Sequence, residues 1–312
     1  MNCTLSAKLS ITILRPLALL LFIAAFSPLS ICGQEISENK IRVAHCNCPA
    51  LKKTAHTIHS RIDEGSGLVV WNGKLWTHND SGKPTLFAVD TLSGMLLEEF
   101  ILPVKNVDWE EITQDRNFLY IGNFGNNAGK REQLQIYRIS KENLLQQKVV
   151  LDSISFEWPK TADLGSLRKI NFDCEAMIVV NDTILLFTKE YKKRRCSRIF
   201  KLPATPSHHI AEYVTTLKTR TLITGVTYSE ESRRVVLCGY SRLLSPRIVT
   251  FTLSGKGIGT ITNAKQIRVR GYFRQNEGVA TRNGIDYYVI SEATNLKIWR
   301  NKSRICKVTI NP

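Results

Sequence analysis

Five short segments of the sequence open with a polar residue, which is followed by a small or polar residue and then an apolar run. The opening residues are Ser66, Glu110, Glu175, Thr224 and Glu277. If the segments are equivalent strands around one axis, these side chains meet there. Three carboxylates in one channel repel each other unless a cation lies between them, and oxygen ligands suit Ca²⁺. The pattern predicts an axial Ca²⁺ site, with a second interpretation left open: the glutamates accept backbone amides of neighbouring strands and bind no ion.

A second polar set follows the next apolar run of several units. His78-Asn79-Asp80 is too polar to continue a strand, so we expect it on a loop at one channel mouth. We assign His78 and Asp80 as candidate acid or base catalysts. The candidate substrate-binding residues are Asn79, Asn123, Asn127, Lys189 and Glu292. The alternative is turn chemistry, because Asn, Asp, Ser and Gly are frequent in turns.

The steps between the five segments are 44, 65, 49 and 53 residues, the size of a propeller blade. Each segment is followed by further β-rich runs separated by turn signals such as Asn72-Gly73. This periodicity predicts an all-β, five-bladed β-propeller rather than an open β-sandwich. In the last unit we expect residues 296–299 as the third strand. Residues 57–61 would supply its outer strand, so that an N-terminal strand closes the ring.

The N-terminus is typical of an exported protein. Lys8 and Arg15 flank the start of an apolar stretch that runs from Leu14 to about residue 25, and small residues follow it. This arrangement predicts a secretory signal peptide over residues 1–33, and a retained membrane anchor is the alternative. Lipidation of Cys32 is not expected, since isoleucine precedes it where a lipobox needs a small residue.

The remaining chain divides into a lead-in over 34–54 and a propeller domain over 55–312. We expect a monomer that is secreted, periplasmic or on the cell surface, with no transmembrane segment after signal cleavage. Cysteines beyond the signal could form disulfides in an oxidising compartment or serve as small core residues.

The chain carries a formal charge of +16, which favours an anionic ligand or an envelope component as partner. Aromatic residues do not alternate with the basic ones, so no nucleic-acid partner is expected. The common hydrolase signatures are missing from the sequence. Asp108 and Glu110 alternate on one strand, and Asp173 and Glu175 repeat that spacing, which favours a structural or metal-binding role.

Four motifs carry a resemblance to known proteins. Residues 75–82, 106–112, 122–127 and 173–176 resemble a family of secreted bacterial β-propeller proteins of mostly uncharacterised function. A more distant similarity is to the calcium-activated nucleotidases (apyrases), five-bladed propellers in which Ser and Glu residues at the inner strand starts hold an axial Ca²⁺. This similarity implies the same ligand role for the five opening residues, with Thr224 in place of a serine.

Two functions follow as hypotheses. The first is a Ca²⁺-containing binding or scaffold protein of the cell envelope. The second is a Ca²⁺-dependent hydrolase of phosphate esters or other anionic substrates that uses the mouth around His78 and Asp80. Fold alone does not decide between them.

Overall fold

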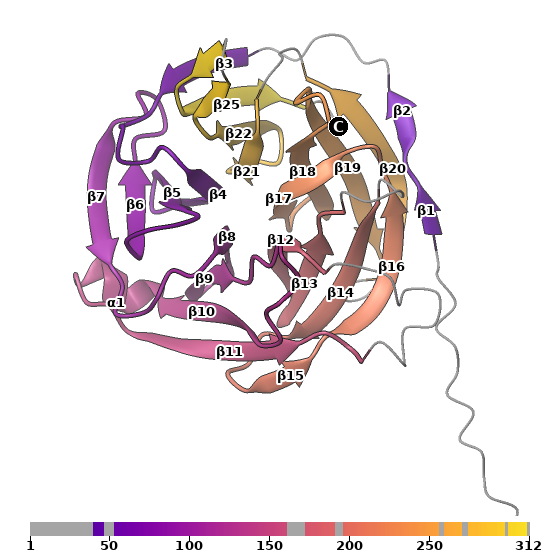
Figure 1. Cartoon of the computed structure of the whole chain (residues 1–312), viewed down its shortest axis with the longest axis horizontal. Helices are drawn as coiled ribbons and strands as arrows, with labels where there is room; N and C mark the ends of the chain where they lie inside the picture. The colour runs from indigo at the N-terminus through magenta and orange to yellow at the C-terminus, as the bar shows by residue number, and fades with distance from the viewer. Residues whose placement is uncertain are drawn as a thin grey trace, which may run out of the picture. The chain divides into compact units, whose positions relative to one another are not determined.

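The structure, a computed structural model, describes residues 40–46, 53–160, 172–190, 196–255, 259–269, 274–296 and 299–310. Its strands form five antiparallel blades of a β-propeller, as the periodicity predicts (Figure 1). Blades one and two are β4 (Gly65–Trp71), β5 (Lys74–Asn79), β6 (Thr85–Val89) and β7 (Leu96–Ile101), then β8 (Trp109–Gln114), β9 (Phe118–Asn123), β10 (Leu134–Ser140) and β11 (Leu151–Glu157). Blade three is β12 (Cys174–Val180), β13 (Thr183–Thr188), β14 (Ser197–Pro203) and β16 (Glu212–Lys218).

Blade four is β17 (Leu222–Ser229), β18 (Arg234–Tyr240), β19 (Pro246–Ser254) and β20 (Thr260–Arg268). Blade five is β21 (Asn276–Thr281), β22 (Asp286–Ser291), β25 (Arg304–Thr309) and β3 (Lys53–Thr57). The first strands of the blades, β4, β8, β12, β17 and β21, face the centre of the ring (Figure 1). Any side chain placed at the start of these inner strands therefore points toward one channel.

Short hairpins connect the strands within a blade. In the turn between β4 and β5, Asn72 and Gly73 have φ angles of 48° and 73°. Positive φ at both central residues is the requirement of a type I′ turn, whose twist matches that of the flanking strands. The Asn-Gly signal in the sequence therefore marks this hairpin correctly.

A β-bulge interrupts each inner strand near its start. In four blades the pairing skips a single residue, and these residues are Glu110, Glu175, Thr224 and Glu277. In blade one the pairing shifts between Ser66 and Val69. A bulge bends its strand and re-aims a side chain, so it positions the polar residues that open the inner strands.

An apolar cluster lies between each pair of adjacent blades, and five such clusters occur among the described residues. The cluster between blades five and one contains Ile58, Ile62, Leu68 and Ile290, which come from both ends of the chain. Burial of a large apolar side chain stabilises the folded state by about 2 kcal/mol. The ring is therefore held closed by the same kind of packing that joins its other blades.

Three further strands lie on the outer edges of blades. β1 (Lys40–Arg42) pairs with β16 of blade three and β2 (Ala44–Cys46) with β20 of blade four, both in parallel. β15 (His208–Ile210) pairs in parallel with β11 of blade two. These strands satisfy backbone groups that an open edge would present to other chains. The segment expected as a lead-in thus contributes strands to two blades.

The predicted closing strand from the N-terminal part of the chain is present. The residues predicted for it were wrong, and so were those predicted for the third strand of blade five. β3 covers residues 53–57 rather than 57–61 and pairs with β25. β25 is the third strand of blade five, whereas Leu296 and Trp299 belong to a separate hairpin of β23 (Thr294–Leu296) and β24 (Trp299–Asn301). The hairpin lengthens the connection between β22 and β25 and shifts the third strand toward the C-terminus.

The described residues contain few other elements. One short helix, α1 (Lys141–Leu145), follows β10 and begins at Ser140, whose hydroxyl accepts from the amide of Asn143. Cys174 and Cys238 are buried free thiols, which supports their role as small core residues. Cys196 and Cys306 are buried as well.

The predicted signal peptide, Cys32 and Cys48 lie outside the described residues. Within the part of the chain that the structure describes, no helix has the length and apolar character needed to cross a membrane.

We predict that β3 matters more for stability than β1 and β2 do. A chain that starts at residue 53 keeps β3 and loses only two edge strands. A chain that starts at residue 58 leaves β25 as an uncovered edge and weakens the contact between blades five and one. We expect the second truncation to lose about 3 kcal/mol more than the first, or about 6 °C in thermal midpoint. Equal midpoints in calorimetry would contradict a closing role for β3.

Candidate functional site

The five residues that open the inner strands are brought together, as predicted. Each is buried, and each lies near the start of an inner strand that faces the channel. The Ser66 hydroxyl donates to the carbonyl of Glu110 at 2.8 Å, and the Thr224 hydroxyl donates to the carbonyl of Asn276. The carboxyl group of Glu175 acts electrostatically on both Glu110 and Glu277. The two hydroxyls therefore serve to link neighbouring blades.

A lysine ammonium lies among the axial glutamates. Lys189 follows the end of β13, and its Nζ lies 2.6 Å from Oε1 of Glu175, with both side chains buried. Burial alone would lower the pKa of Lys189, but Glu175 and its neighbours raise it well above the ordinary value. The lysine therefore keeps its proton and supplies positive charge where the sequence predicts a metal ion.

The axial carboxyl groups hold protons more strongly than exposed ones do. Burial raises the pKa of Glu110 and Glu277 well above the ordinary glutamate value, while Lys189 opposes the shift. Burial also raises the pKa of Glu175 to about 8, even with Lys189 beside it. These carboxyl groups lie at the mouth of the channel, at the N-terminal ends of the inner strands. They share protons with one another and lie beside one ammonium group.

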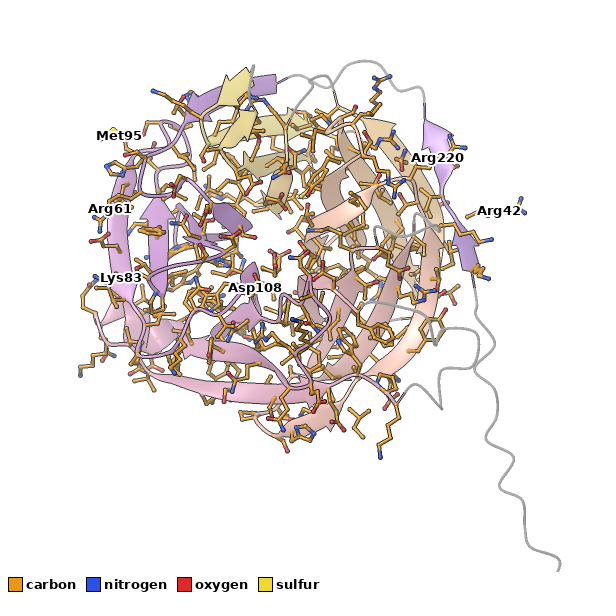
Figure 2. The ribbon with its side chains drawn as sticks, viewed as in Figure 1. Arg42, Arg61, Lys83, Met95, Asp108 and Arg220 are labelled. Atoms are coloured by element: carbon orange, nitrogen blue, oxygen red, sulfur yellow. The ribbon has the colours of Figure 1, made fainter. Side chains whose placement is uncertain are left out.

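Each of the two Asp-x-Glu motifs brings its pair of carboxyl groups together. The carboxyl group of Asp108 interacts with that of Glu110, and the carboxyl group of Asp173 interacts with that of Glu175. Gly125 lies against the first pair, where a Cβ atom would overlap both carboxyl groups. Figure 2 shows Asp108 near the centre of the ring, consistent with its place before the inner strand β8. The two carboxyl groups of each motif therefore interact, but Asp108 and Asp173 precede β8 and β12, so the prediction that each pair alternates along one strand was wrong.

A second group of carboxylates lies nearer to solvent. Asp80 and Glu292 follow the second strands of blades one and five and are half-buried, and Glu64 is exposed. Burial, and then repulsion from Glu64, raises the pKa of Asp80 to about 7. Burial also raises the pKa of Glu292 to about 7, with Lys189 opposing. At neutral pH a cation can replace protons on both groups.

His78 lies deeper than expected. β5 continues through His78 and Asn79, so the prediction that the loop begins at His78 was wrong. The imidazole is fully buried, and its edge faces Trp109 at 5.4 Å between ring centroids. Burial lowers its pKa to about 4, so the ring is neutral at neutral pH. In this position the His78 ring packs between blades one and two.

The asparagines proposed for substrate binding differ in position. Asn123 is buried, and its Oδ1 accepts from the amides of Val107 and Asp108 at 3.2 and 3.1 Å. Asn79 donates to the carbonyl of Arg61 at 2.9 Å, and Asn127 is exposed. Asn123 therefore fixes the segment that carries Asp108 into the channel.

The residue that our sequence analysis did not single out is Glu111. It is fully buried, its Oε1 accepts from the amide of Ile112 at 3.0 Å, and its Oε2 accepts from the amide of Val226 at 2.8 Å. The backbone amides of Leu68 and Met177 also hydrogen-bond to it. These amides belong to β8, β17, β4 and β12, so one carboxylate joins four of the five inner strands. Burial raises its pKa, and the four amides oppose that shift.

Small residues make room for Glu111. The residues at its equivalent place in the other inner strands are Gly67, Ala176, Gly225 and Gly278. A Cβ atom on Gly67 would overlap the backbone nitrogen of Ile112, and one on Gly278 would overlap Gly67. Four of the five equivalent positions hold small residues and the fifth holds a glutamate. This pattern in the sequence could have indicated that a single side chain fills the axis.

A separate cavity opens at the other end of the inner strands. Its volume is about 690 Å³, and its lining includes Val70, Gln114, Asn181, Tyr228 and Thr281. These residues lie at or beyond the C-terminal ends of inner strands, whereas the carboxylates lie at the N-terminal ends. Leu68, Ile112 and Val226, whose amides bind Glu111, also line this cavity. Glu111 therefore lies between the acidic mouth and the cavity.

Comparison with known proteins gives likenesses of fold. No family model matches the chain, and no curated protein matches its sequence. Among solved structures it is similar to a streptogramin B lyase, with 10% identity, a TM-score of 0.41, and 83% of this chain and 98% of that chain covered. It is also similar to a putative oxidoreductase (glucose dehydrogenase) from Thermus thermophilus, with 9% identity, a TM-score of 0.48, and coverages of 82% and 100%. These likenesses concern the β-propeller fold alone, and the resemblance to calcium-activated nucleotidases stays a prediction.

We predict that Glu111→Ala strongly destabilises the protein. The substitution leaves four buried amides without their acceptor, and each unsatisfied donor costs about 1–3 kcal/mol. We expect a total loss of about 4 kcal/mol or more in chemical denaturation. Glu111→Gln is the matched control, because it keeps the volume and one acceptor oxygen and should lose less. The acceptor role would be refuted by an alanine variant as stable as the glutamine variant.

The raised pKa of Asp80 predicts a dependence of stability on pH. Its pKa rises from an ordinary value of 3.8 to about 7 on folding, so the folded state binds the proton more tightly. This contribution is present at low pH and is lost as the pH rises from about 4 to about 7. In Asp80→Asn the decrease in thermal midpoint between about pH 5 and about pH 8 should be smaller than in the unsubstituted chain. An unchanged decrease, measured in chelator, would show that Asp80 titrates normally.

Proposed function

We propose that this chain is an exported β-propeller binding protein that holds a cation at the acidic mouth of its channel. The observation that carries the proposal is the charge of that mouth. Eight carboxyl groups act on one another there: Glu64, Asp80, Asp108, Glu110, Asp173, Glu175, Glu277 and Glu292. In the described part of the chain, Lys189 and Arg131 are the basic side chains that act most strongly on them. Negative charge remains to be neutralised by protons or by a bound cation.

Two further observations support a cation rather than an anion. The chain as a whole carries +16, so the negative mouth is opposite in sign to the rest of the protein. Asp173 is almost fully buried, and its Oδ2 has no hydrogen-bond donor among the described residues, although Oδ1 accepts from the amide of Asn126 at 3.0 Å. An unpartnered buried carboxylate oxygen is costly, and a bound cation would lower that cost. A phosphate ester would be repelled by these groups, so no observation at this mouth favours the hydrolase hypothesis.

The axial residues do not fit Ca²⁺ as they are arranged. An all-oxygen donor set suits a hard cation. However, the Lys189 ammonium lies on Glu175, and the Ser66 and Thr224 hydroxyls donate to backbone carbonyls. Among the described residues, no group of three or more His, Cys, Asp or Glu side chains is arranged to hold a metal ion.

We therefore assign the cation to the outer carboxylates Asp80 and Glu292, with water completing the shell of any metal ion bound there. The candidates are Ca²⁺ and the ammonium or guanidinium group of an organic ligand.

Export is the second part of the proposal. It is supported by the basic start, the apolar middle and the small residues of positions 1–33. We propose that the mature protein acts in the periplasm, in the medium or at the cell surface. Expression with a bacterial export pathway, followed by mass determination of the product, tests this. A mature chain that retains residue 1 would contradict cleavage.

The decisive measurement is calorimetric titration of the mature chain with CaCl₂ and, separately, with spermidine at neutral pH. Because Asp80 and Glu292 have pKa values of about 7, binding should release protons. The measured enthalpy should then vary with the ionisation enthalpy of the buffer. At a hundredfold excess over its dissociation constant the cation should add about 2.7 kcal/mol to stability.

Matched variants separate a site from a general charge effect. Asp80→Asn and Glu292→Gln should each weaken binding by about tenfold, equivalent to about 1.4 kcal/mol. Glu142→Gln, on the exposed face of α1, should bind normally. Binding of Ca²⁺ alone would support an ion site, and binding of spermidine alone would support an organic cation. If neither binds, or if all variants bind alike, the proposal fails.

A further inference from the structure

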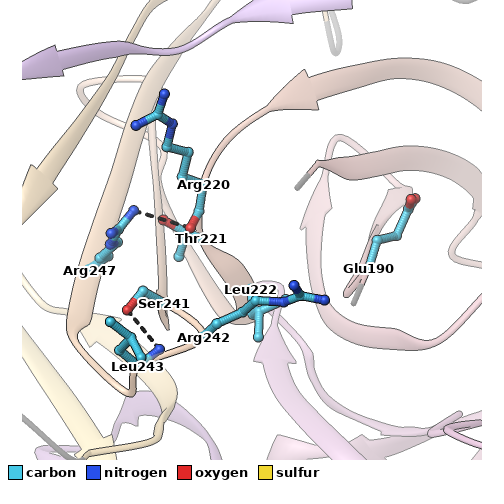
Figure 3. Close-up of a pocket in the computed structure, with 8 residues that line it drawn as sticks. All are labelled: Glu190, Arg220, Thr221, Leu222, Ser241, Arg242, Leu243 and Arg247. Carbon is cyan, nitrogen blue, oxygen red and sulfur yellow. Dashed lines mark hydrogen bonds between the residues drawn. The ribbon is translucent and has the colours of Figure 1, made fainter. Parts of the chain in front are cut away.

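A small pocket lined by arginines lies among the loops of blades three and four. Its volume is about 150 Å³, and its lining includes Glu190, Arg220, Thr221, Arg242, Leu243 and Arg247 (Figure 3). Arg220 lies between β16 and β17, Arg242 lies in the turn between β18 and β19, and Arg247 lies near the start of β19. Three arginine residues thus line one pocket, from the loop before β17, the turn before β19 and the start of β19.

The backbone around this pocket is held firmly. Arg247 donates from Nη1 to the carbonyl of Arg220 at 3.1 Å, so one arginine fixes the loop that carries another. In the next turn, Ser241 Oγ accepts from the amides of Leu243 and Ser245 at 3.3 and 3.2 Å. Figure 3 draws two of these hydrogen bonds at the edge of the pocket, one from Arg247 to Arg220 and one between Ser241 and Leu243. The site is therefore formed before any ligand arrives.

A hydrogen-bond network fixes the wall of the pocket as well. The hydroxyls of Thr219 and Thr221 both donate to Oε1 of Gln266, at 2.9 and 2.8 Å. These three side chains are buried. They join the loop before β17 to the outer strand β20, so the position of Arg220 does not depend on its own exposed side chain.

The carboxylate in the lining is committed to a partner outside the pocket. Glu190 forms an ion pair with Arg198, and the side chains of both residues are buried, with exposed fractions of 7% and 1%. It also accepts from the thiol of Cys196 at 3.3 Å and from the hydroxyl of Thr188 at 3.2 Å. Glu190 therefore has its ion-pair and hydrogen-bond partners within blade three.

Strand pairing adds a further arginine near this site. Arg247 on β19 lies directly opposite Arg268 on β20. Two arginines at directly opposite positions add positive charge on this side of blade four. The planar guanidinium group presents donors that match the oxygens of a phosphate group, and such pairs are strong when two donors engage.

We propose that this pocket binds a phosphate group. It is separate from the acidic mouth, with which it shares no residue, so it gives the protein a second site of opposite charge. Leu243, at the edge of the pocket, is 81% exposed, which suits a phosphate carried on a body with apolar parts. The phosphate could come from a dissolved phosphate ester or from the headgroup of an anionic lipid. The same chemistry serves both sources.

The test compares inorganic phosphate and lipid vesicles as probes on the full mature chain. The variants are Arg242→Gln and Arg220→Gln, which change exposed side chains, and Arg282→Gln is the control. Arg282 is also exposed, but it lies in the turn after β21, away from the pocket. Thermal melts of each variant confirm that the fold is retained. Phosphate is titrated against chloride at equal ionic strength, so that general screening is the same in both.

We expect Arg242→Gln and Arg220→Gln to weaken phosphate binding about tenfold, equivalent to about 1.4 kcal/mol, while Arg282→Gln binds normally. Binding of free phosphate with this dependence supports a site for dissolved phosphate esters. Binding to phosphatidylcholine vesicles only when phosphatidylglycerol is included, with the same dependence on Arg242, supports a lipid headgroup. No binding of either probe, or binding that all three variants share equally, overturns the proposal. Loss of cation binding at the acidic mouth would not affect this result.

Discussion

The carboxylate of Glu111 determines how closely the inner strands can approach. Backbone amides of β4, β8, β12 and β17 point toward the channel and would be left without acceptors if water were excluded. One side chain meets this requirement for all four strands, and the small residues at the equivalent positions allow the strands to converge on it. Because buried unsatisfied amides are costly, the axis of this propeller is stabilised by an anion that belongs to the chain itself. Because Glu111 fills the axis, the acidic mouth at the N-terminal ends of the inner strands and the cavity at their C-terminal ends are separate spaces.

The acidic mouth follows from the bulges at the inner strand starts. In four blades the bulge frees one residue from the ladder and directs it toward the channel, and three of these residues are glutamates. Their mutual repulsion is reduced in two ways: by protons, since burial raises their pKa values, and by the Lys189 ammonium. A buried carboxylate cluster of this kind is tolerated only if its charge is matched. The outer carboxylates Asp80 and Glu292 have no comparable ion pair in the described part of the chain, which is why we assign the ligand to them.

Much of the fold could be predicted from the sequence, because period and turn chemistry are local. Five repeated segments indicated five blades, and the residues that open them do meet at the axis. The partner of Glu175 could not be predicted, since it depends on where Lys189 points after β13 ends. The third strand of blade five was misplaced because the hairpin of β23 and β24 also reads as β-rich sequence. The arginine pocket could not be predicted for a different reason: its residues come from loops and strand starts of blades three and four, and only the packing of these blades brings them together.

Two sites of opposite charge can lie close to each other only if the charged side chains at their boundary are paired within the protein. Lys189 and Glu190 are consecutive residues at the end of β13, yet the lysine reaches the carboxylates of the channel and the glutamate pairs with Arg198 inside blade three. If the two side chains exchanged directions, an ammonium group would meet the arginines and a ninth carboxylate would enter the mouth. Both changes would bury unmatched charge, which costs several kcal/mol per group. The opposite directions of these two neighbours therefore keep the acidic mouth and the basic pocket distinct, and the rigid blades between them hold that separation fixed.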